Sequence, residues 1–223
     1  MKIICKNISK SYKNIDNGLK NIIINNTSFS LESGDSLAIT GPSGVGKSTL
    51  LNIISGLDCQ DEGDIFFNDF CFSNLSTSDK TNFRLKNISL IFQSHNLLKD
   101  FNVSENILIP LVYKGFKKKE ALKITSESLE RVNMMQHQFS SISTLSGGEA
   151  QRVGIARAIS MQSRIILADE PTGNLDTESS ALIMSYLKDV CLEKKITLIV
   201  VTHDSNILSS LRNTRKMVDG KII

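Results

Sequence analysis

The segment GPSGVGKS, from Gly41 to Ser48, constrains the fold of this 223-residue chain more than any other feature. The apolar run SLAIT precedes it and the amphipathic segment TLLNIISGL follows it. Together they match G-x-x-x-x-G-K-[S/T] in the strand, loop and helix context that this phosphate-binding pattern requires. Glycines allow the backbone to wrap a phosphate chain so that successive N–H groups point inward. We therefore expect a phosphate loop, residues 41–48, between a buried strand and a helix.

Two side chains of this loop carry specific expectations. Lys47 is expected to reach the β- and γ-phosphates as a point charge, and the Ser48 hydroxyl is placed to ligate Mg²⁺. The alternative is a glycine-rich turn with an incidental lysine, and the flanking strand and helix argue against it. The residues predicted to contact the nucleotide here are Gly41, Pro42, Ser43, Gly44, Val45, Gly46, Lys47, Ser48 and Thr49.

Two further apolar runs, RIILAD and ITLIVVT, end in polar residues at the same predicted edge of a parallel sheet. Asp169 stands where an Mg²⁺ ligand would sit, and Glu170 can act as the base for an attacking water. His203 follows the second run and is assigned a γ-phosphate contact. The alternative for the two acids is a pair that caps the next loop, and for His203 a structural histidine.

The segment TLSGGEAQRVGIARAIS places two glycines, Gly147 and Gly148, directly before a pattern typical of a helix. A helix N-terminus without bulky side chains presents free N–H groups and the positive end of the dipole. We therefore predict a second anion-binding position at this helix start.

Short β-branched runs separated by helical periodicity indicate an α/β fold. From about residue 97 to 138 the strands disappear, which predicts a charged helical insert. Its basic run, residues 117–119, is interpreted as a solvated helix start, with lipid head groups as the alternative.

Composition narrows the class of protein. A net charge of +3 is too small to indicate a nucleic-acid partner. The longest apolar runs are far below the ~20 residues of a membrane-spanning helix, and the first residues do not resemble a signal peptide. We expect a cytoplasmic chain whose four widely spaced cysteines are reduced and structural.

Six segments carry a family resemblance in their order and spacing: the phosphate loop, Gln93 in LIFQSHNLL, LSGGEAQRV, IILADEP, GNLD and VTHD. Through them the whole chain resembles the ATP-binding cassette (ABC) ATPases. The resemblance implies one domain, residues 1–223, with a mostly parallel core sheet, a small antiparallel β subdomain and a helical subdomain at about 97–150. It also implies ATP and Mg²⁺ as cofactors and ATP hydrolysis as the activity.

In this family two cassettes stack head to tail. The segment Leu145–Glu149, the signature segment, would then meet the ATP held by the phosphate loop of the partner. The resemblance implies γ-phosphate contacts in trans from Ser146, Gly147 and Gly148, with Glu149 and Gln151 near the nucleotide.

The remaining implied roles concern single residues. Gln93 resembles the residue that touches Mg²⁺ or the attacking water and signals to a membrane partner. Tyr12 resembles the aromatic residue that stacks on adenine. Asp176 resembles the residue that communicates between the two nucleotide sites of the dimer. The expected catalytic set is Glu170, His203, Gln93 and Lys47, and the expected metal set is Ser48, Gln93 and Asp169. Ile142 and Ser163 stand where the family often has prolines, which concerns rigidity and not catalysis.

LADEPTGNLD and FQSHNLLKDFNVSENILIPL resemble the ATP-binding subunits of lipoprotein-releasing systems. This implies an ATPase homodimer, peripheral on the cytoplasmic face of the inner membrane, that drives membrane subunits without touching the lipoprotein. The alternatives are a macrolide or peptide exporter and the division-associated complex, including a scaffold that uses ATP only to assemble. A chromosome-structuring ATPase would carry long heptads, and a translation factor would carry two cassettes.

Overall fold

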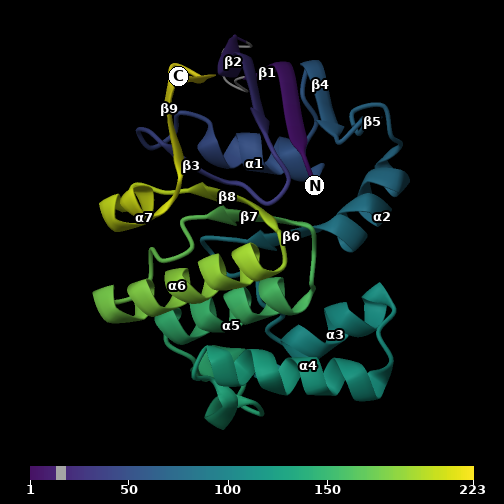
Figure 1. The fold of residues 1–223 in the computed structure, drawn as a ribbon, viewed down its shortest axis with the longest axis vertical. Helices are drawn as coiled ribbons and strands as arrows, with labels where there is room; N and C mark the ends of the chain where they lie inside the picture. Colours follow the sequence, from purple (N-terminus) through teal and green to yellow (C-terminus); the bar gives the residue numbers. More distant parts are fainter. Residues whose placement is uncertain (14–18) are drawn as a thin grey trace.

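The computed structural model describes residues 1–13 and 19–223, which form two sheets with helices between and below them (Figure 1). The smaller sheet is antiparallel, with the order β2-β1-β4-β5. Its strands are β1 (Ile3–Lys13), β2 (Lys20–Leu31), β4 (Glu62–Phe67) and β5 (Phe70–Cys71). The expected small antiparallel β subdomain is therefore confirmed.

The larger sheet is mostly parallel, with the order β10-β9-β3-β8-β7-β6. Every neighbouring pair is parallel except β9 with β10, the terminal pair. The strands β7 and β8 are almost completely buried, which explains their continuous apolar sequences. The bounds are β3 (Ser36–Thr40), β6 (Ile88–Ile91), β7 (Ile165–Asp169), β8 (Thr197–Val201), β9 (Asn213–Val218) and β10 (Lys221–Ile222).

Alternate residues of the parallel sheet serve two separate cores. Leu37 and Ile39 of β3 pack with α1 and the antiparallel sheet, whereas Ala38 between them packs with the helices on the opposite face. This is the period of two expected for a strand buried on both sides. The helix α1 (Lys47–Ser55), which starts at the phosphate loop, is thus held between the two sheets.

The other helices lie below the parallel sheet and beside it (Figure 1). Helix α5 packs against α3, α4 and α6, and one hydrophobic cluster joins them to the sheet. The bounds are α2 (Thr77–Asn87), α3 (Val103–Lys114), α4 (Lys118–Arg131), the 3₁₀ helices Met135–His137 and Ile142–Thr144, α5 (Gly147–Ser160), α6 (Thr177–Glu193) and α7 (Ser205–Ser210).

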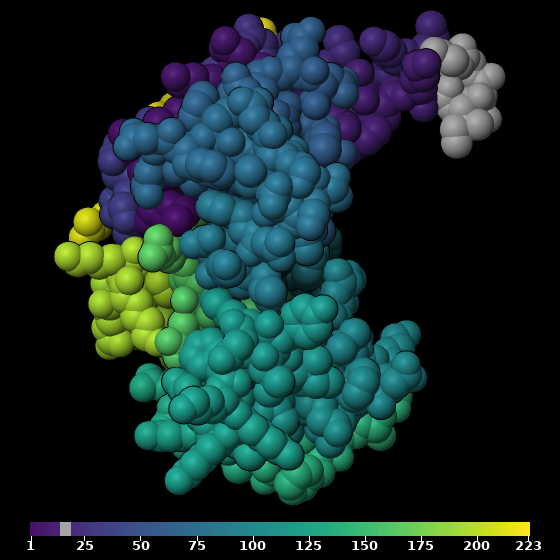
Figure 2. Space-filling model, turned by 90° about the vertical axis from the view of Figure 1, so that its right-hand side faces the viewer, coloured from purple at the N-terminus to yellow at the C-terminus, as the bar shows by residue number. Residues whose placement is uncertain are grey.

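Viewed from the side, the molecule has a concave outline (Figure 2). The N-terminal strands project at one end and the helical segment around α3 and α4 projects at the other. The expected end of the helical subdomain, residue 150, lies inside α5, which continues to Ser160. The extent 97–150 therefore stays a proposal. None of the helices in residues 1–13 and 19–223 combines the length and the apolarity needed to cross a membrane.

The two positions where prolines are common in the family are occupied here by ordered residues. Ile142 opens a 3₁₀ helix capped by Ser141. Ser163 is buried, and its hydroxyl accepts a hydrogen bond from Ser89 at 2.9 Å. A local cap at Ile142 and a long-range hydrogen bond at Ser163 therefore order the two positions without a proline ring.

Candidate nucleotide-binding site

The phosphate loop owes its shape to glycines at two crowded positions. Gly41 and Gly46 have φ values of 151° and 108°, in the region that L side chains rarely adopt. A Cβ on Gly41 would lie 2.4 Å from the carbonyl oxygen of Met217, and a Cβ on Gly46 would lie 2.6 Å from that of Ile23. Strands β9 and β2 therefore press on the two ends of the loop, and side chains there would displace it.

The N-terminus of α1 is open. Its N-cap is Gly46, no side chain caps it, and its first turn contains no acidic residue. The first N–H groups of a helix have no intrahelical partner, and the dipole makes this end positive. The Lys47 Nζ donates to the carbonyl oxygens of Gly41 and Pro42, each at 2.8 Å, and so lies across the loop. The loop thus gathers positive charge where a phosphate chain would enter.

A carboxylate and a hydroxyl meet beside this loop. Ser48 in the first turn of α1 is hydrogen-bonded to Asp169 at the end of β7. Burial raises the pKa of Asp169, and the neighbouring Glu170 adds to this, whereas the Ser48 hydrogen bond and Lys47 oppose it. A divalent cation would offset the cost of burying this carboxylate, and oxygen ligands suit Mg²⁺.

The donor set on the chain is small. Within the described residues no group of three or more His, Cys, Asp and Glu side chains gathers into a metal site. Ser48 and Asp169 therefore fit a Mg²⁺ ion only together with phosphate oxygens and water, which is how this ion usually binds with nucleotides.

The next residue, Glu170, is held by two neighbours at the end of β8. Its carboxylate accepts a hydrogen bond from the Thr202 hydroxyl at 3.1 Å and pairs with the His203 Nδ1 at 2.7 Å. The Glu170 side chain is 13% exposed and the His203 side chain 78% exposed. Because the carboxylate is the acceptor, Nδ1 carries the proton and Nε2 is left free toward solvent.

Glu170 itself has a φ of 46°, an uncommon conformation for a non-glycine residue. Its N–H donates to the Val201 carbonyl at 2.9 Å, which continues the pairing of β7 with β8 for one residue. The adjacency of these parallel strands therefore brings Asp169, Glu170 and His203 to one edge, as the sequence predicted.

The segment after β6 connects this edge to α5. Gln93 is exposed, and its carbonyl oxygen accepts a hydrogen bond from the Asn174 side chain at 3.3 Å. His95, which the sequence analysis left without a role, bonds to Gln151, and Gln151 donates to the Pro171 carbonyl at 2.7 Å. Gln151 is 1% exposed and its side chain joins two loops in the interior, and its expected place near the nucleotide stays a prediction.

The signature segment has a closed helix N-terminus. The Ser146 hydroxyl caps the Glu149 amide, and the Glu149 carboxylate accepts from the Ser146 amide and hydroxyl, each at 2.8 Å. These bonds lower the pKa of Glu149. Its other carboxylate oxygen lies 3.4 Å from His137 Nε2. Among the described residues, these polar contacts stay within the helical part and do not reach the phosphate loop of the same chain.

Gly148 is packed against the segment that follows Glu170. A Cβ on Gly148 would lie 3.3 Å from the Asn174 carbonyl oxygen and 3.4 Å from Leu175 Cδ2. Asp176, two residues further, caps α6 by accepting from the Ser179 amide at 2.9 Å and its hydroxyl at 2.7 Å. The carboxylate of Asp176 is thus engaged in a helix cap in this state of the chain.

Tyr12 lies near the end of β1, 44% exposed. Its hydroxyl donates to Asp58 Oδ2 at 2.5 Å, and the Lys10 Nζ stands 4.9 Å from the ring centroid. Sequence reasoning found Tyr12 and missed Lys10 and Asp58. The separation of 46 residues between Tyr12 and Asp58 left no local pattern from which this contact could be predicted.

Comparisons with known proteins agree with this geometry. The family model described as ABC transporter matches residues 24–173. The lipoprotein-releasing system ATP-binding protein LolD of Wigglesworthia glossinidia brevipalpis is 41% identical over 98% of this chain and 94% of its own. The protein of the same name from Treponema denticola is 37% identical over 99% of this chain and 96% of its own.

Solved structures resemble the fold closely. The dimeric post-hydrolysis state of the ATP-binding cassette MJ0796 bound to ADP and Pi superimposes with a TM-score of 0.94 at 33% identity, covering 99% of this chain and 96% of that chain. A second dimeric structure of MJ0796, titled a bacterial ABC transporter cassette, also gives a TM-score of 0.94, at 34% identity. By its motifs, its fold and its relatives, this chain belongs to the ABC transporter family, as an ATP-binding cassette.

Proposed function

We propose that this chain is the ATP-hydrolysing motor subunit of a complex that releases lipoproteins from the inner membrane for transfer to the outer membrane. The observation that carries this is the likeness to proteins named LolD over nearly the full length of both chains. The edge formed by Asp169, Glu170 and His203 beside the phosphate loop supplies the chemistry such a motor needs.

In the proposed reaction, the open N-terminus of α1 and the ammonium of Lys47 bind the phosphate chain of ATP. Lys47 would exchange its two carbonyl partners for phosphate oxygens. Ser48 and Asp169, with Gln93 as the third proposed ligand, would hold Mg²⁺, which would neutralise charge on the phosphates. Glu170 takes the proton of the attacking water at its carboxylate, while Thr202 and His203 fix the orientation of that carboxylate.

The proposed active state is a dimer. The signature segment does not bond to the phosphate loop of its own chain, and its first amides, at Gly147 and Gly148, are free of intrahelical partners. A second copy placed head to tail would bring them to the γ-phosphate, with Ser146. The dimeric MJ0796 structures support a dimer by likeness.

The proposed membrane partners need a surface on the cytoplasmic side. A mainly apolar groove of 390 Å³ lies between α2, β6, α3 and α5, with Leu85, Leu90 and Tyr113 in its lining. Phe92 and Asn96, on either side of Gln93, also line it. A segment of a membrane subunit seated there would touch the loop that bonds to Asn174 and, through His95 and Gln151, to Pro171. The chain would then be a peripheral protein of the inner membrane.

The test is affinity purification of the Glu170→Gln variant from detergent-solubilised native membranes with ATP, followed by identification of the co-purifying proteins. We expect ATP binding to persist, hydrolysis to fall below a hundredth of the parent rate, and two related lipoprotein-releasing membrane subunits to be recovered. The matched control is Glu193→Gln, at the exposed C-terminal end of α6. Parent-rate hydrolysis by Glu170→Gln would contradict the assignment of the base.

Recovery of a single exporter subunit or of a division protein would keep the ATPase mechanism and change the cargo. These are the alternatives that the sequence leaves open, and the site geometry is the same for each. The co-purifying subunits therefore decide the cargo, and the hydrolysis rate decides the chemistry.

A further inference from the structure

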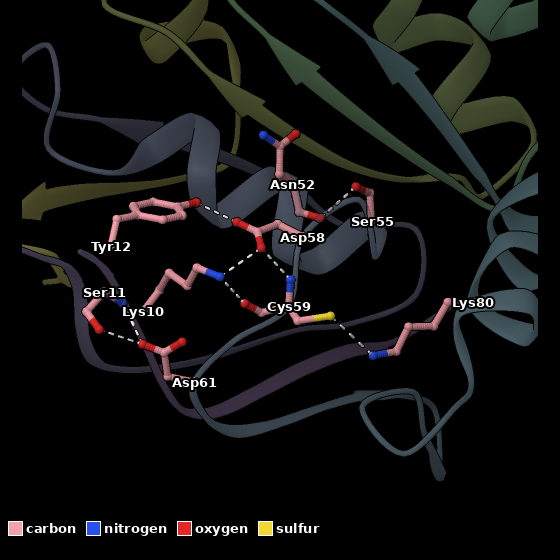
Figure 3. A network of polar contacts seen from close by, with 9 residues as sticks. All are labelled: Lys10, Ser11, Tyr12, Asn52, Ser55, Asp58, Cys59, Asp61 and Lys80. Atoms are coloured by element: carbon pink, nitrogen blue, oxygen red, sulfur yellow. Dashed lines mark hydrogen bonds and ion pairs between the residues drawn. The ribbon is translucent and has the colours of Figure 1, made fainter. Parts of the chain in front are cut away.

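Asp58 is the centre of a polar network between β1 and the end of α1 (Figure 3). Its Oδ2 accepts from the Tyr12 hydroxyl at 2.5 Å, and its Oδ1 accepts from the Lys10 Nζ and from the Cys59 amide at 2.8 and 2.7 Å. Lys10 also donates to the Cys59 carbonyl at 2.6 Å. One carboxylate therefore fixes both the hydroxyl of the tyrosine and the ammonium beside its ring.

This network is attached to the helix of the phosphate loop. After α1 ends, the amides of Leu57 and Asp58 donate to the carbonyl of Asn52 at 2.9 and 3.2 Å, which turns Asp58 back toward β1. Thr49, in the first turn of α1, also hydrogen-bonds the Tyr12 hydroxyl. Tyr12 is thus tied to both ends of the helix whose N-terminus forms the phosphate site.

The ring of Tyr12 has a cation on one side. The Lys10 Nζ lies 4.9 Å from the ring centroid, a cation–π distance. The residue is nevertheless 44% exposed, so part of its surface remains open to solvent. A partly exposed ring that is held at its hydroxyl can receive a planar base by stacking.

The network keeps its charges near neutral pH. Partial burial raises the pKa of Asp58, but the hydrogen bonds from Lys10, Tyr12 and the Cys59 amide outweigh it, and the pKa lies below its ordinary value. The pKa of Lys10 shifts in the opposite direction. Burial lowers it, but the hydrogen bond and the charge of Asp58 outweigh burial, and the pKa lies above its ordinary value. The carboxylate and the ammonium are therefore both ionised in the range where ATP is bound.

We propose that Asp58 is a positioning residue for the adenine of ATP, acting through Tyr12, with Lys10 as its second anchor. It holds the ring at a fixed place relative to the phosphate loop, so that base and triphosphate meet one preformed surface. Pre-organisation of this kind raises affinity because less side-chain freedom is lost on binding. The inference rests on the proposed function, in which Tyr12 stacks on adenine.

The test compares ATP with inorganic tripolyphosphate, which has the phosphate chain and no base, by titration calorimetry. Two variants cut the same bond from opposite ends: Asp58→Ala removes the acceptor, and Tyr12→Phe keeps the ring and removes the donor. Asp58→Ala is expected to weaken ATP binding roughly three- to tenfold, the effect of one lost hydrogen bond, and Tyr12→Phe, which also loses the Thr49 contact, at least as much; both should leave tripolyphosphate binding unchanged. The matched control is Asp61→Ala, whose carboxylate bonds to the Ser11 amide and hydroxyl and not to the ring.

Tyr12→Ala separates this inference from the assignment on which it rests. We expect it to weaken ATP binding about tenfold, as loss of one stacking contact does, and we expect Asp58→Ala to add nothing further in that background. An unchanged ATP affinity in Tyr12→Ala would contradict the adenine contact itself. A loss in Tyr12→Ala without a loss in Asp58→Ala, an additive double variant, or an equal loss for tripolyphosphate would overturn the positioning role alone.

Discussion

The chain contains two glycine-bearing helix starts that are built in opposite ways. The phosphate loop leads into α1 through Gly46, with no side-chain cap and no acidic residue in the first turn. The signature segment leads into α5 through a complete capping box made by Ser146 and Glu149. The first helix end has no capping side chain, whereas the second is capped by its own serine and carboxylate and leaves only the amides of Gly147 and Gly148 unpaired within the helix.

The difference suggests a division of labour between the two ends. An open helix terminus with a lysine beside it can bind a phosphate chain within a single subunit. A capped terminus is stable without a ligand and offers only the amides of Gly147 and Gly148, together with the Ser146 hydroxyl, to a phosphate that arrives from outside. The first should thus decide binding by one chain, and the second should decide assembly of two.

The largest expected effect is at the open end. Lys47→Ala should abolish measurable ATP binding, because charge-assisted hydrogen bonds contribute about 1.5–3 kcal/mol each and this ammonium is placed to make two or more. Titration calorimetry with ATP measures this, with Lys118→Ala at the exposed start of α4 as the control. If Lys47→Ala bound ATP with the parent affinity, the proposed difference between the N-termini of α1 and α5 would be contradicted.

A smaller effect is expected at the packed glycine of the capped end. In Gly148→Ala the new Cβ meets the Asn174 carbonyl oxygen at 3.3 Å, so the segment around Asn174 must shift by a few tenths of an ångström to accommodate it. In a Glu170→Gln background, ATP-dependent dimerisation measured by sedimentation should weaken, while ATP binding by the monomer should not. Equal weakening of both would mean that the signature segment acts within one chain.

The fold was largely predictable because its buried strands are continuous apolar runs. The predicted strand SLAIT coincides with β3, and RIILAD and ITLIVVT lie within one residue of β7 and β8. By contrast, β9 was not predicted, since four of its six residues are exposed and its sequence NTRKMV carries no apolar pattern. Its place beside β3 is decided by parallel pairing across more than 170 residues of chain, which no local rule contains.

The site was predictable to the extent that it lies at strand ends and glycine loops. Asp169, Glu170 and His203 meet because parallel strands end at one edge. The sequence could not reveal which face of α5 would be buried next to the loops, and so the contacts that Gln151 makes with His95 and with the Pro171 carbonyl were not predicted. Asp58 was missed because 46 residues of chain separate it from Tyr12.

Removing the cap should cost a modest amount of stability. Ser146→Ala deletes the hydroxyl that caps the Glu149 amide, which costs about 1 kcal/mol of unfolding free energy in the absence of ATP. Urea unfolding measures this, with Ser143→Ala in the preceding 3₁₀ helix as the control. If Ser146→Ala lowered the free energy of unfolding of the ATP-bound dimer and not that of the free chain, Ser146 would act on the nucleotide and not as a helix cap.

The smallest effect concerns the charge of Glu149. Glutamine can still form the capping box, so Glu149→Gln should cost only a few tenths of a kcal/mol at pH 7, from the lost attraction to the helix dipole. Because the Ser146 hydrogen bonds hold the pKa of Glu149 below its ordinary value, the folded chain takes up this proton less readily than the unfolded chain. The stability that the carboxylate adds is therefore present above the unfolded pKa of about 4.3 and is lost as the pH falls through the lower, folded value. Unfolding curves of the parent and Glu149→Gln should differ by this amount at pH 8, and the difference should vanish once the pH lies below the folded pKa of Glu149; a difference that persisted there would contradict a cap made by the ionised carboxylate.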